Sequence, residues 1–148
     1  GPRGPGTANG YIMIDSGIPP DDLIQSINAH IRESGHHGHG DDILFFPMPA
    51  VPVDLEVTAY PLLSCGEERR EALRTAVEDM VRAAFRENQD IEISRTFPQS
   101  RFSFSQLDRE LHDALPDLRS VEFSLPDIVS ELSLPVLRTL AVRLGEGV

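Results

Sequence analysis

Residues 51–60 carry the pattern that most constrains the fold of this chain. Five apolar side chains, at Val51, Val53, Leu55, Val57 and Ala59, alternate with Pro52, Asp54, Glu56, Thr58 and Tyr60. Successive side chains of a β-strand point to opposite faces of the sheet. The alternation therefore predicts a strand with one face on a core and the other on water or a neighbouring molecule.

Two segments have the three- and four-residue apolar spacing of amphipathic helices. The first is predicted over 20–34, where Pro19 and Pro20 precede the acidic first-turn residues Asp21 and Asp22. The second is predicted over 65–87, after a Ser64-Cys-Gly-Glu67 sequence that has the form of a capping box. Its expected buried face consists of Leu73, Val77, Met80, Val81, Ala84 and Phe85.

A third, shorter helix is predicted from Ser103 or Ser105 to Pro116, with a buried face of Leu107, Leu111, Ala114 and Leu115. Further strands are predicted over 11–15, 43–46, 121–125 and 135–144, and Ile91 and Ile93 could begin another. Pro47, Pro49 and Pro52 indicate a kink or an edge position between the second and third strands. Residues 127–133 are expected to form a polar connection.

This order of elements predicts an α+β fold, a mixed β-sheet with two to three helices packed mainly on one face. Such a two-layer sandwich could also divide into two small subdomains. We expect a linker or fragment start over 1–10, a β-α-β-β-α subdomain over 11–87, and an α-β-β subdomain over 88–148 packed with the first.

The composition excludes several classes of function. The chain has 148 residues and a net charge of −11, which argues against a nucleic-acid partner because phosphate binding needs a basic surface. No apolar run approaches the roughly 18 residues that span a bilayer, so no membrane partner is expected. Cys65 is the single cysteine, which rules out an internal disulfide.

The best candidate metal ligands lie in the loop before the second predicted strand, at His36, His37, His39, Asp41 and Asp42. Imidazoles and carboxylates suit zinc or nickel. However, histidines separated by glycines lack the rigid spacing of a helical pair, and the sequence identifies no residues that would hydrogen-bond to these ligands and orient them. A polar loop is the favoured interpretation, and a metal site is the alternative.

Cys65 is a second candidate, since a helix N-terminus can activate a thiol. A cysteine nucleophile also needs a base, and nothing in the sequence brings His30 or His112 to it. The chain contains no GxSxG, HExxH, CxxC or phosphate-loop sequence. We therefore expect no enzyme, no cofactor and no small-molecule substrate.

Several segments together resemble the baseplate J-like family of contractile-tailed phages, of the Mu-like prophage type. Arg3-Gly-Pro-Gly-Thr7 and the following strand resemble one passage of that family, and the helix beginning at Pro19 resembles the next. The most telling match is the strand, proline turn and alternating strand over 41–57. The segments 67–85, 104–107 and 134–140 are similar in order and spacing. The loop 36–40 and the turn 116–119 depart from the family pattern.

The resemblance implies a structural protein of the virion tail baseplate, made in the bacterial host cytoplasm. Its implied partners are other baseplate and tail proteins, with self-association as a further option, and the chain would be the C-terminal portion of a longer protein. It implies no particular site residues. Two alternatives remain open: a metal-binding module or metal-dependent enzyme that uses the 36–42 loop, and an adaptor of a secretion machine with tail-like ancestry.

Overall fold

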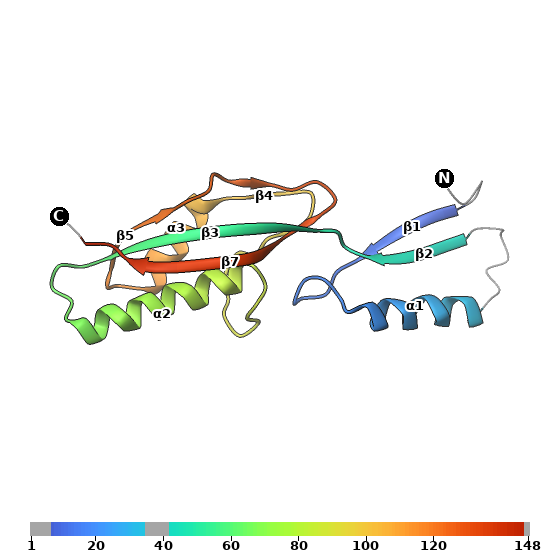
Figure 1. Cartoon of the computed structure of the whole chain (residues 1–148), viewed down its shortest axis with the longest axis horizontal. Helices are drawn as coiled ribbons and strands as arrows, with labels where there is room; N and C mark the ends of the chain where they lie inside the picture. Colours follow the sequence, from blue (N-terminus) through green and yellow to red (C-terminus); the bar gives the residue numbers. More distant parts are fainter. Residues whose placement is uncertain (1–6, 35–41, 147–148) are drawn as a thin grey trace. The chain divides into compact units, whose positions relative to one another are not determined.

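The computed structural model describes residues 7–34 and 42–146. The chain divides into two compact units, Gly1–Pro49 and Ala50–Val148 (Figure 1). Helices and strands are present in similar amounts, and the sheets include both parallel and antiparallel pairs, so the predicted α+β class is confirmed. Among the described residues, no helix is long and apolar enough to cross a membrane.

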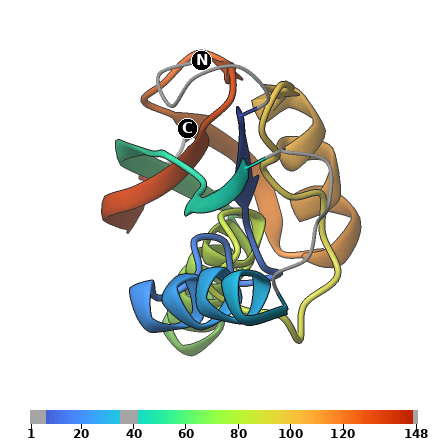
Figure 2. The same ribbon diagram turned by 90° about the vertical axis from the view of Figure 1, so that its right-hand side faces the viewer.

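Unit 1 is a β-α-β arrangement of β1 (Thr7–Ile12), α1 (Asp21–Ser34) and β2 (Asp42–Pro47). The two strands pair in parallel, and α1 packs against β2 (Figure 1, Figure 2). The strand predicted over 11–15 begins earlier, at Thr7, and so includes residues 7–10. Partner residues on β2, beginning with Asp42 opposite Thr7, hold this stretch in a strand despite its weak local pattern.

The Asn28 side chain of α1 closes part of the outer edge of β2. Its Nδ2 donates to the carbonyl oxygen of Phe45 and its Oδ1 accepts from the Phe45 amide, each at 2.9 Å. On the neighbouring position, the rings of Tyr11 and Phe46 lie 6.0 Å apart between centroids. Both bonds of Asn28 are those that another strand would make.

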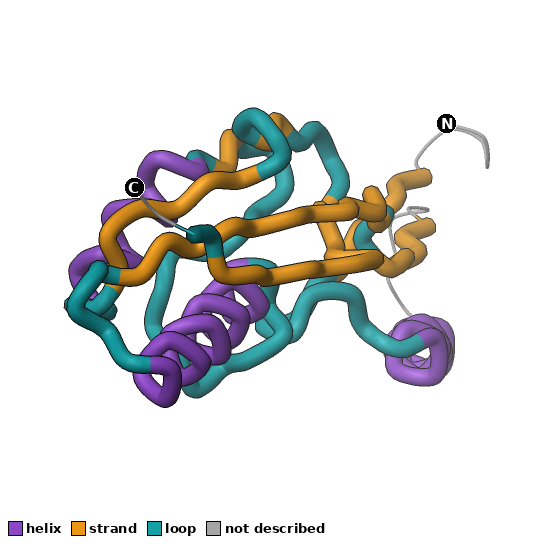
Figure 3. Tube along the Cα trace, turned by 60° about the vertical axis from the view of Figure 1, so that its left-hand side comes forward, coloured by secondary structure: helices purple, strands orange, loops and turns teal. Residues whose placement is uncertain are grey.

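Unit 2 is built on β3 (Ala50–Pro61), the strand predicted from the alternating pattern. It pairs in parallel with β7 (Leu134–Leu144) along most of its length and in antiparallel with β5 (Leu118–Phe123) at its C-terminal end. Figure 3 shows the long strands side by side. A separate short ribbon joins β4 (Arg101–Phe102) to β6 (Ile128–Val129).

Helices α2 (Glu67–Ala84) and α3 (Phe104–Ala114) cover the apolar face of this sheet. The predicted apolar face of α2 is buried in full. Among the core residues, nine side chains from β3 and the two helices have 4% exposure or less: Leu55, Val57, Ala59, Leu73, Val77, Val81, Ala84, Leu107 and Leu111. The core therefore lies in one layer between sheet and helices.

Several local predictions were wrong. Helix α2 begins after Gly66, whose position at the N-cap provides no side-chain hydrogen bond, so Ser64 and Glu67 form no capping box. No strand forms at Ile91 or Ile93, whereas the connection over 127–133 contains β6. Ala114 is exposed. The compact units divide between residues 49 and 50, because β3 pairs with strands from the C-terminal half of the chain.

Helix α2 ends in a Schellman motif that lacks the usual glycine. The Glu87 amide donates to the Arg82 carbonyl and the Arg86 amide to the Ala83 carbonyl, both at 2.9 Å. Arg86 occupies the left-handed position with φ 72°. Its side chain is 5% exposed, its Nε donates to the Thr96 carbonyl at 2.8 Å, and its Cζ lies 4.5 Å from the centroid of the Phe97 ring.

Candidate interaction surface

The structure leaves the predicted metal loop untested. His36, His37, His39 and Asp41 lie outside the described residues, and Asp42 begins β2 with a side chain that is likewise outside them. Within residues 7–34 and 42–146, no group of three or more His, Cys, Asp or Glu side chains could hold a metal ion. The 36–42 site therefore stays a prediction.

Cys65 is a buried thiol in the turn before α2, and its amide donates to the Leu62 carbonyl at 3.0 Å. The contacts of His112 lie elsewhere. Its Nδ1 is 2.7 Å from Asp108 Oδ1 and 2.9 Å from the Asp108 carbonyl, and its Nε2 is 3.3 Å from the Arg119 carbonyl. Both ring nitrogens of His112 are thus engaged away from Cys65, which fits a structural cysteine.

The functional surface best defined by the described residues is the sheet face of unit 2 opposite the helices. We call it the outer sheet face. The alternation of β3 directs Asp54, Glu56, Thr58 and Tyr60 to it, because Val53, Leu55, Val57 and Ala59 point into the core. Neighbouring strands supply Arg138, Thr139, Ala141 and Arg143 from β7, Glu122 from β5, and Ser124 just beyond β5.

Asp54 and Arg138 form the strongest pair on this face. Arg138 donates from Nε to Asp54 Oδ1 at 3.0 Å and from Nη2 to Oδ2, while Thr139 Oγ1 donates to Oδ1 at 2.8 Å. The hydrogen bond from Arg138, followed by the one from Thr139, lowers the pKa of Asp54 to about 2. The carboxylate is therefore charged at any pH near neutrality.

Glu56 and Arg143 form a looser pair at the next position along β3. Arg143 Nη2 lies 3.8 Å from Glu56 Oε2, and its Nε donates to Thr58 Oγ1 at 3.4 Å. On the other side of Glu56, Ser124 Oγ accepts from the Glu56 amide at 2.9 Å and the Ser124 amide donates to the Glu56 carbonyl at 3.0 Å. These bonds extend the contact of β3 past the end of β5.

Tyr60 closes the outer sheet face at the end of β3. A Cβ atom added to Gly145 would clash with the ring of Tyr60, so a larger residue at this position would require the ring to move. The guanidinium carbon of Arg119 is 5.8 Å from the ring centroid. Partial burial, and then the charge of Glu122, raise the pKa of Tyr60 above its usual value, so its hydroxyl stays protonated at neutral pH.

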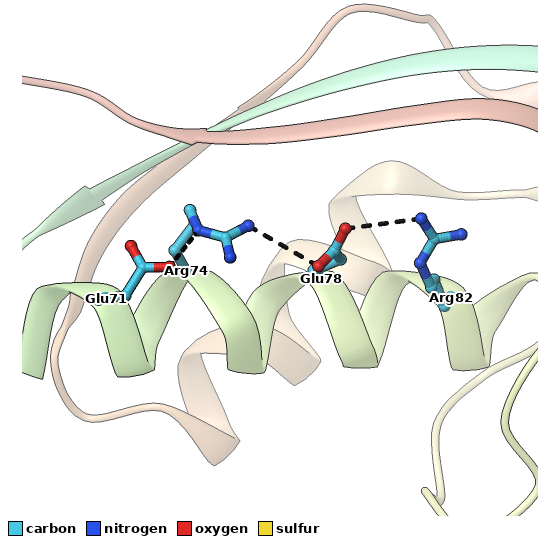
Figure 4. Close-up of polar contacts among 4 residues, drawn as sticks. All are labelled: Glu71, Arg74, Glu78 and Arg82. Atoms are coloured by element: carbon cyan, nitrogen blue, oxygen red, sulfur yellow. Dashed lines mark hydrogen bonds and ion pairs between the residues drawn. The ribbon is translucent and has the colours of Figure 1, made fainter.

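Helix α2 carries a second row of paired charges, on residues Glu71, Arg74, Glu78 and Arg82 (Figure 4). Arg74 Nε lies 2.8 Å from Glu71, Arg74 Nη1 lies 3.7 Å from Glu78, and Arg82 Nη2 lies 3.5 Å from Glu78. Spacings of three and four residues place these side chains next to one another on a helix surface. Each of these ion pairs is expected to contribute little to the stability of the fold, because the side chains are exposed to solvent.

The geometry of these charges suits recognition more than catalysis. The carboxylates of Asp54 and Glu56 face arginines and are engaged in ion pairs with them. The sequence analysis identified the outward residues of β3. It missed the arginine partners. Asp54 and Arg138 are 84 positions apart in the sequence, and Glu56 and Arg143 are 87 apart, so each pair meets only through the parallel pairing of β3 with β7.

Comparison with known proteins gives one relative of clear interest. No protein-family model matches the chain. Over 99 residues, 66% of its length, the chain is 40% identical to a protein of Haemophilus phage HP1 (strain HP1c1) named "Putative baseplate protein gp29". The match covers 25% of that protein, so the chain spans about a quarter of the length of this curated relative. The similarity supports the baseplate part of the resemblance described above, and it gives no support to the J-like family in particular.

Proposed function

We propose that this chain is a structural, non-catalytic part of a phage tail baseplate and acts through protein–protein contacts. The observation that carries the proposal is the 40% identity over 99 residues to a protein named as a baseplate component. The outer sheet face is consistent with it, since its carboxylates are committed to ion pairs and hydrogen bonds within the sheet.

A finer proposal follows from the sequence resemblance. The chain would belong to a J-like wedge protein of a contractile tail, would contact other baseplate and tail proteins, and would reside in the virion. Two rigid faces support such a role, because assembly by geometry needs surfaces that hold their shape. The Asp54–Arg138 pair and the row of charges on α2 fix side chains on both exposed sides of unit 2.

Interruption of the gene that encodes this chain tests the proposal. In a phage carrying an amber codon within the gene, a non-suppressing host should release particles whose tails lack a baseplate under the electron microscope. Supplying the full-length protein in trans should restore infectivity. Intact baseplates and normal titre from the amber phage would refute the structural role. Normal assembly of a non-contractile tail would refute only the finer, contractile-tail proposal.

A further inference from the structure

Strand β7 has a long backbone edge that pairs with no other strand in the described part of the chain. It forms one border of the sheet β5-β3-β7, and its 11 residues pair only with β3. The Gly145 amide donates to the Ala59 carbonyl, so the backbone groups of Arg143 and Ala141 also turn toward β3 and those of Leu140, Val142 and Leu144 turn away. Among the described residues, none makes a hydrogen bond to these three outward backbone positions.

Two other strand edges, those of β2 and β5, each have a polar side chain in contact with their backbone. Asn28 binds the amide and carbonyl of Phe45 on β2, and His112 Nε2 lies 3.3 Å from the Arg119 carbonyl on β5. Proteins usually protect exposed edges, because unpaired strands template association with other chains. Among the described residues, no side chain binds the outward backbone groups of Leu140, Val142 and Leu144 on β7 in this way.

We infer that the edge of β7 binds an extended segment of another protein, which adds a strand to the sheet and carries carboxylates on one face and aliphatic side chains on the other. This edge belongs to unit 2 alone, and its binding of a strand does not depend on the baseplate proposal. Strand addition supplies affinity through main-chain hydrogen bonds and specificity through alternate side chains.

Charge on the outer sheet face selects the carboxylates. The side chains of Arg138 and Arg143 are each 63% exposed, and β7 contains no acidic residue. Arg138 uses Nε and Nη2 on Asp54, which leaves Nη1 able to bind a further acceptor. A second copy of β7 would bring only arginines to this face, so a different, acidic segment fits better.

Apolar contacts on the inner side select the aliphatic residues. Leu140 and Leu144 are half-buried and pack at the border of the core. Helix α2 packs against β7 and contributes Arg74 and Glu78, whose side chains are 29% and 28% exposed. Aliphatic side chains of an added strand would complete the burial of the two leucines and lie along the methylene groups of Arg74.

Binding of two matched peptides to the full chain tests this inference. One is a blocked, fluorescein-labelled decapeptide of alternating valine and glutamate, and the other replaces glutamate by lysine. Fluorescence anisotropy should show binding of the glutamate peptide at least about tenfold tighter than binding of the lysine peptide. Absence of binding, or equal binding of the two peptides, would overturn the inference.

Two substitutions at one position separate the edge amide from the side chain. Leu140→Pro removes both the leucine and the outward N–H, whereas Leu140→Ala removes only the side chain; proline is tolerated where the N–H faces away from the ladder. We expect Leu140→Pro to bind the glutamate peptide at least about tenfold more weakly than Leu140→Ala, with circular dichroism confirming that both fold. Equal affinities would contradict strand addition.

If Leu140→Pro does not fold, hydrogen exchange on the unsubstituted chain tests whether the peptide pairs with the edge of β7. The glutamate peptide should slow exchange of the Leu140, Val142 and Leu144 amides and leave those of Ala141 and Arg143, already bonded to β3, unchanged. Unchanged exchange at all five amides, or a dimer in sedimentation equilibrium that competes with the peptide, would overturn the proposed partner.

Discussion

Substitutions of Arg86, at the end of α2, can distinguish how much its side-chain contacts stabilise the fold from how much its backbone conformation destabilises it. Arg86 has a φ of 72°, a conformation that costs non-glycine residues about 1–2 kcal/mol. Arg86 occupies the position of the Schellman motif at which glycine is usual. Its buried side chain donates to the Thr96 carbonyl and contacts the ring of Phe97. Arg86→Ala and Arg86→Gly both remove these contacts, and only the glycine relieves the backbone.

The magnitude follows from the contacts. A hydrogen bond from a charged donor contributes about 1.5–3 kcal/mol. The contact with the ring of Phe97, which is 53% exposed, adds about 0.5–1 kcal/mol, the range for exposed cation–π pairs. We therefore expect Arg86→Ala to lower the free energy of unfolding by about 3 kcal/mol. Arg86→Gly should lose about 1 kcal/mol less, because glycine adopts a positive φ without strain.

Urea denaturation followed by circular dichroism measures both differences in the full chain. The comparison of glycine with alanine does not depend on how many contacts the arginine makes, because both variants lose all of them. Equal stabilities, or an alanine variant more stable than the glycine variant, would refute the argument from backbone strain. A loss below about 1 kcal/mol in both variants would refute the anchoring role of the side chain.

Three further predictions concern titration and metal content. The Asp54 carboxyl should titrate in NMR spectra near pH 2, and Arg138→Ala should raise the pKa of Asp54 toward 3.8. Because the pKa of Asp54 is lower in the folded state, its ionisation stabilises the fold above the unfolded pKa, and this stabilisation is lost as the pH falls toward 2. The hydrogen bond to the Asp108 carbonyl raises the pKa of His112 above 6.5. Protonated His112 therefore stabilises the fold fully below its unfolded pKa, and this contribution disappears as the pH rises through its folded pKa. His112→Gln should remove this pH dependence from the free energy of unfolding. Elemental analysis of untagged protein should find no retained zinc, and stoichiometric zinc after dialysis against a weak chelator would favour a metal site in the 36–42 loop.

The elements of unit 2 with strong periodicity were predictable from sequence. Residues 51–60 form β3, and the apolar stripes of α2 and α3 are buried at Val77, Leu107 and Leu111, because hydrophobic spacing reports which face meets a core. The two-residue strands β4 and β6 were missed. Strands so short have no detectable period, and they are defined only by the pairing of Arg101 with Val129 and of Phe102 with Ile128.

Long-range partners were beyond the sequence patterns. Alternation shows that Asp54 faces outward, yet the identity of its partner depends on a parallel pairing with a bulge, since Val53 lies opposite Leu137 and Asp54 opposite Thr139. The extra residue, Arg138, reaches the carboxylate because of that bulge. Neither composition nor spacing contains this information. The same holds for Asn28, whose role on β2 requires the packing of α1.

The amide of Asn28 also acts as a register lock on unit 1. A slip of β2 by one residue would exchange the faces of all its side chains and break both bonds to Phe45. A slip by two keeps the faces, but in one direction it presents Pro47, which has no N–H to donate to the Asn28 oxygen. Asn28 and Pro47 thus disfavour a two-residue slip in that direction, which hydrophobic patterning alone would tolerate.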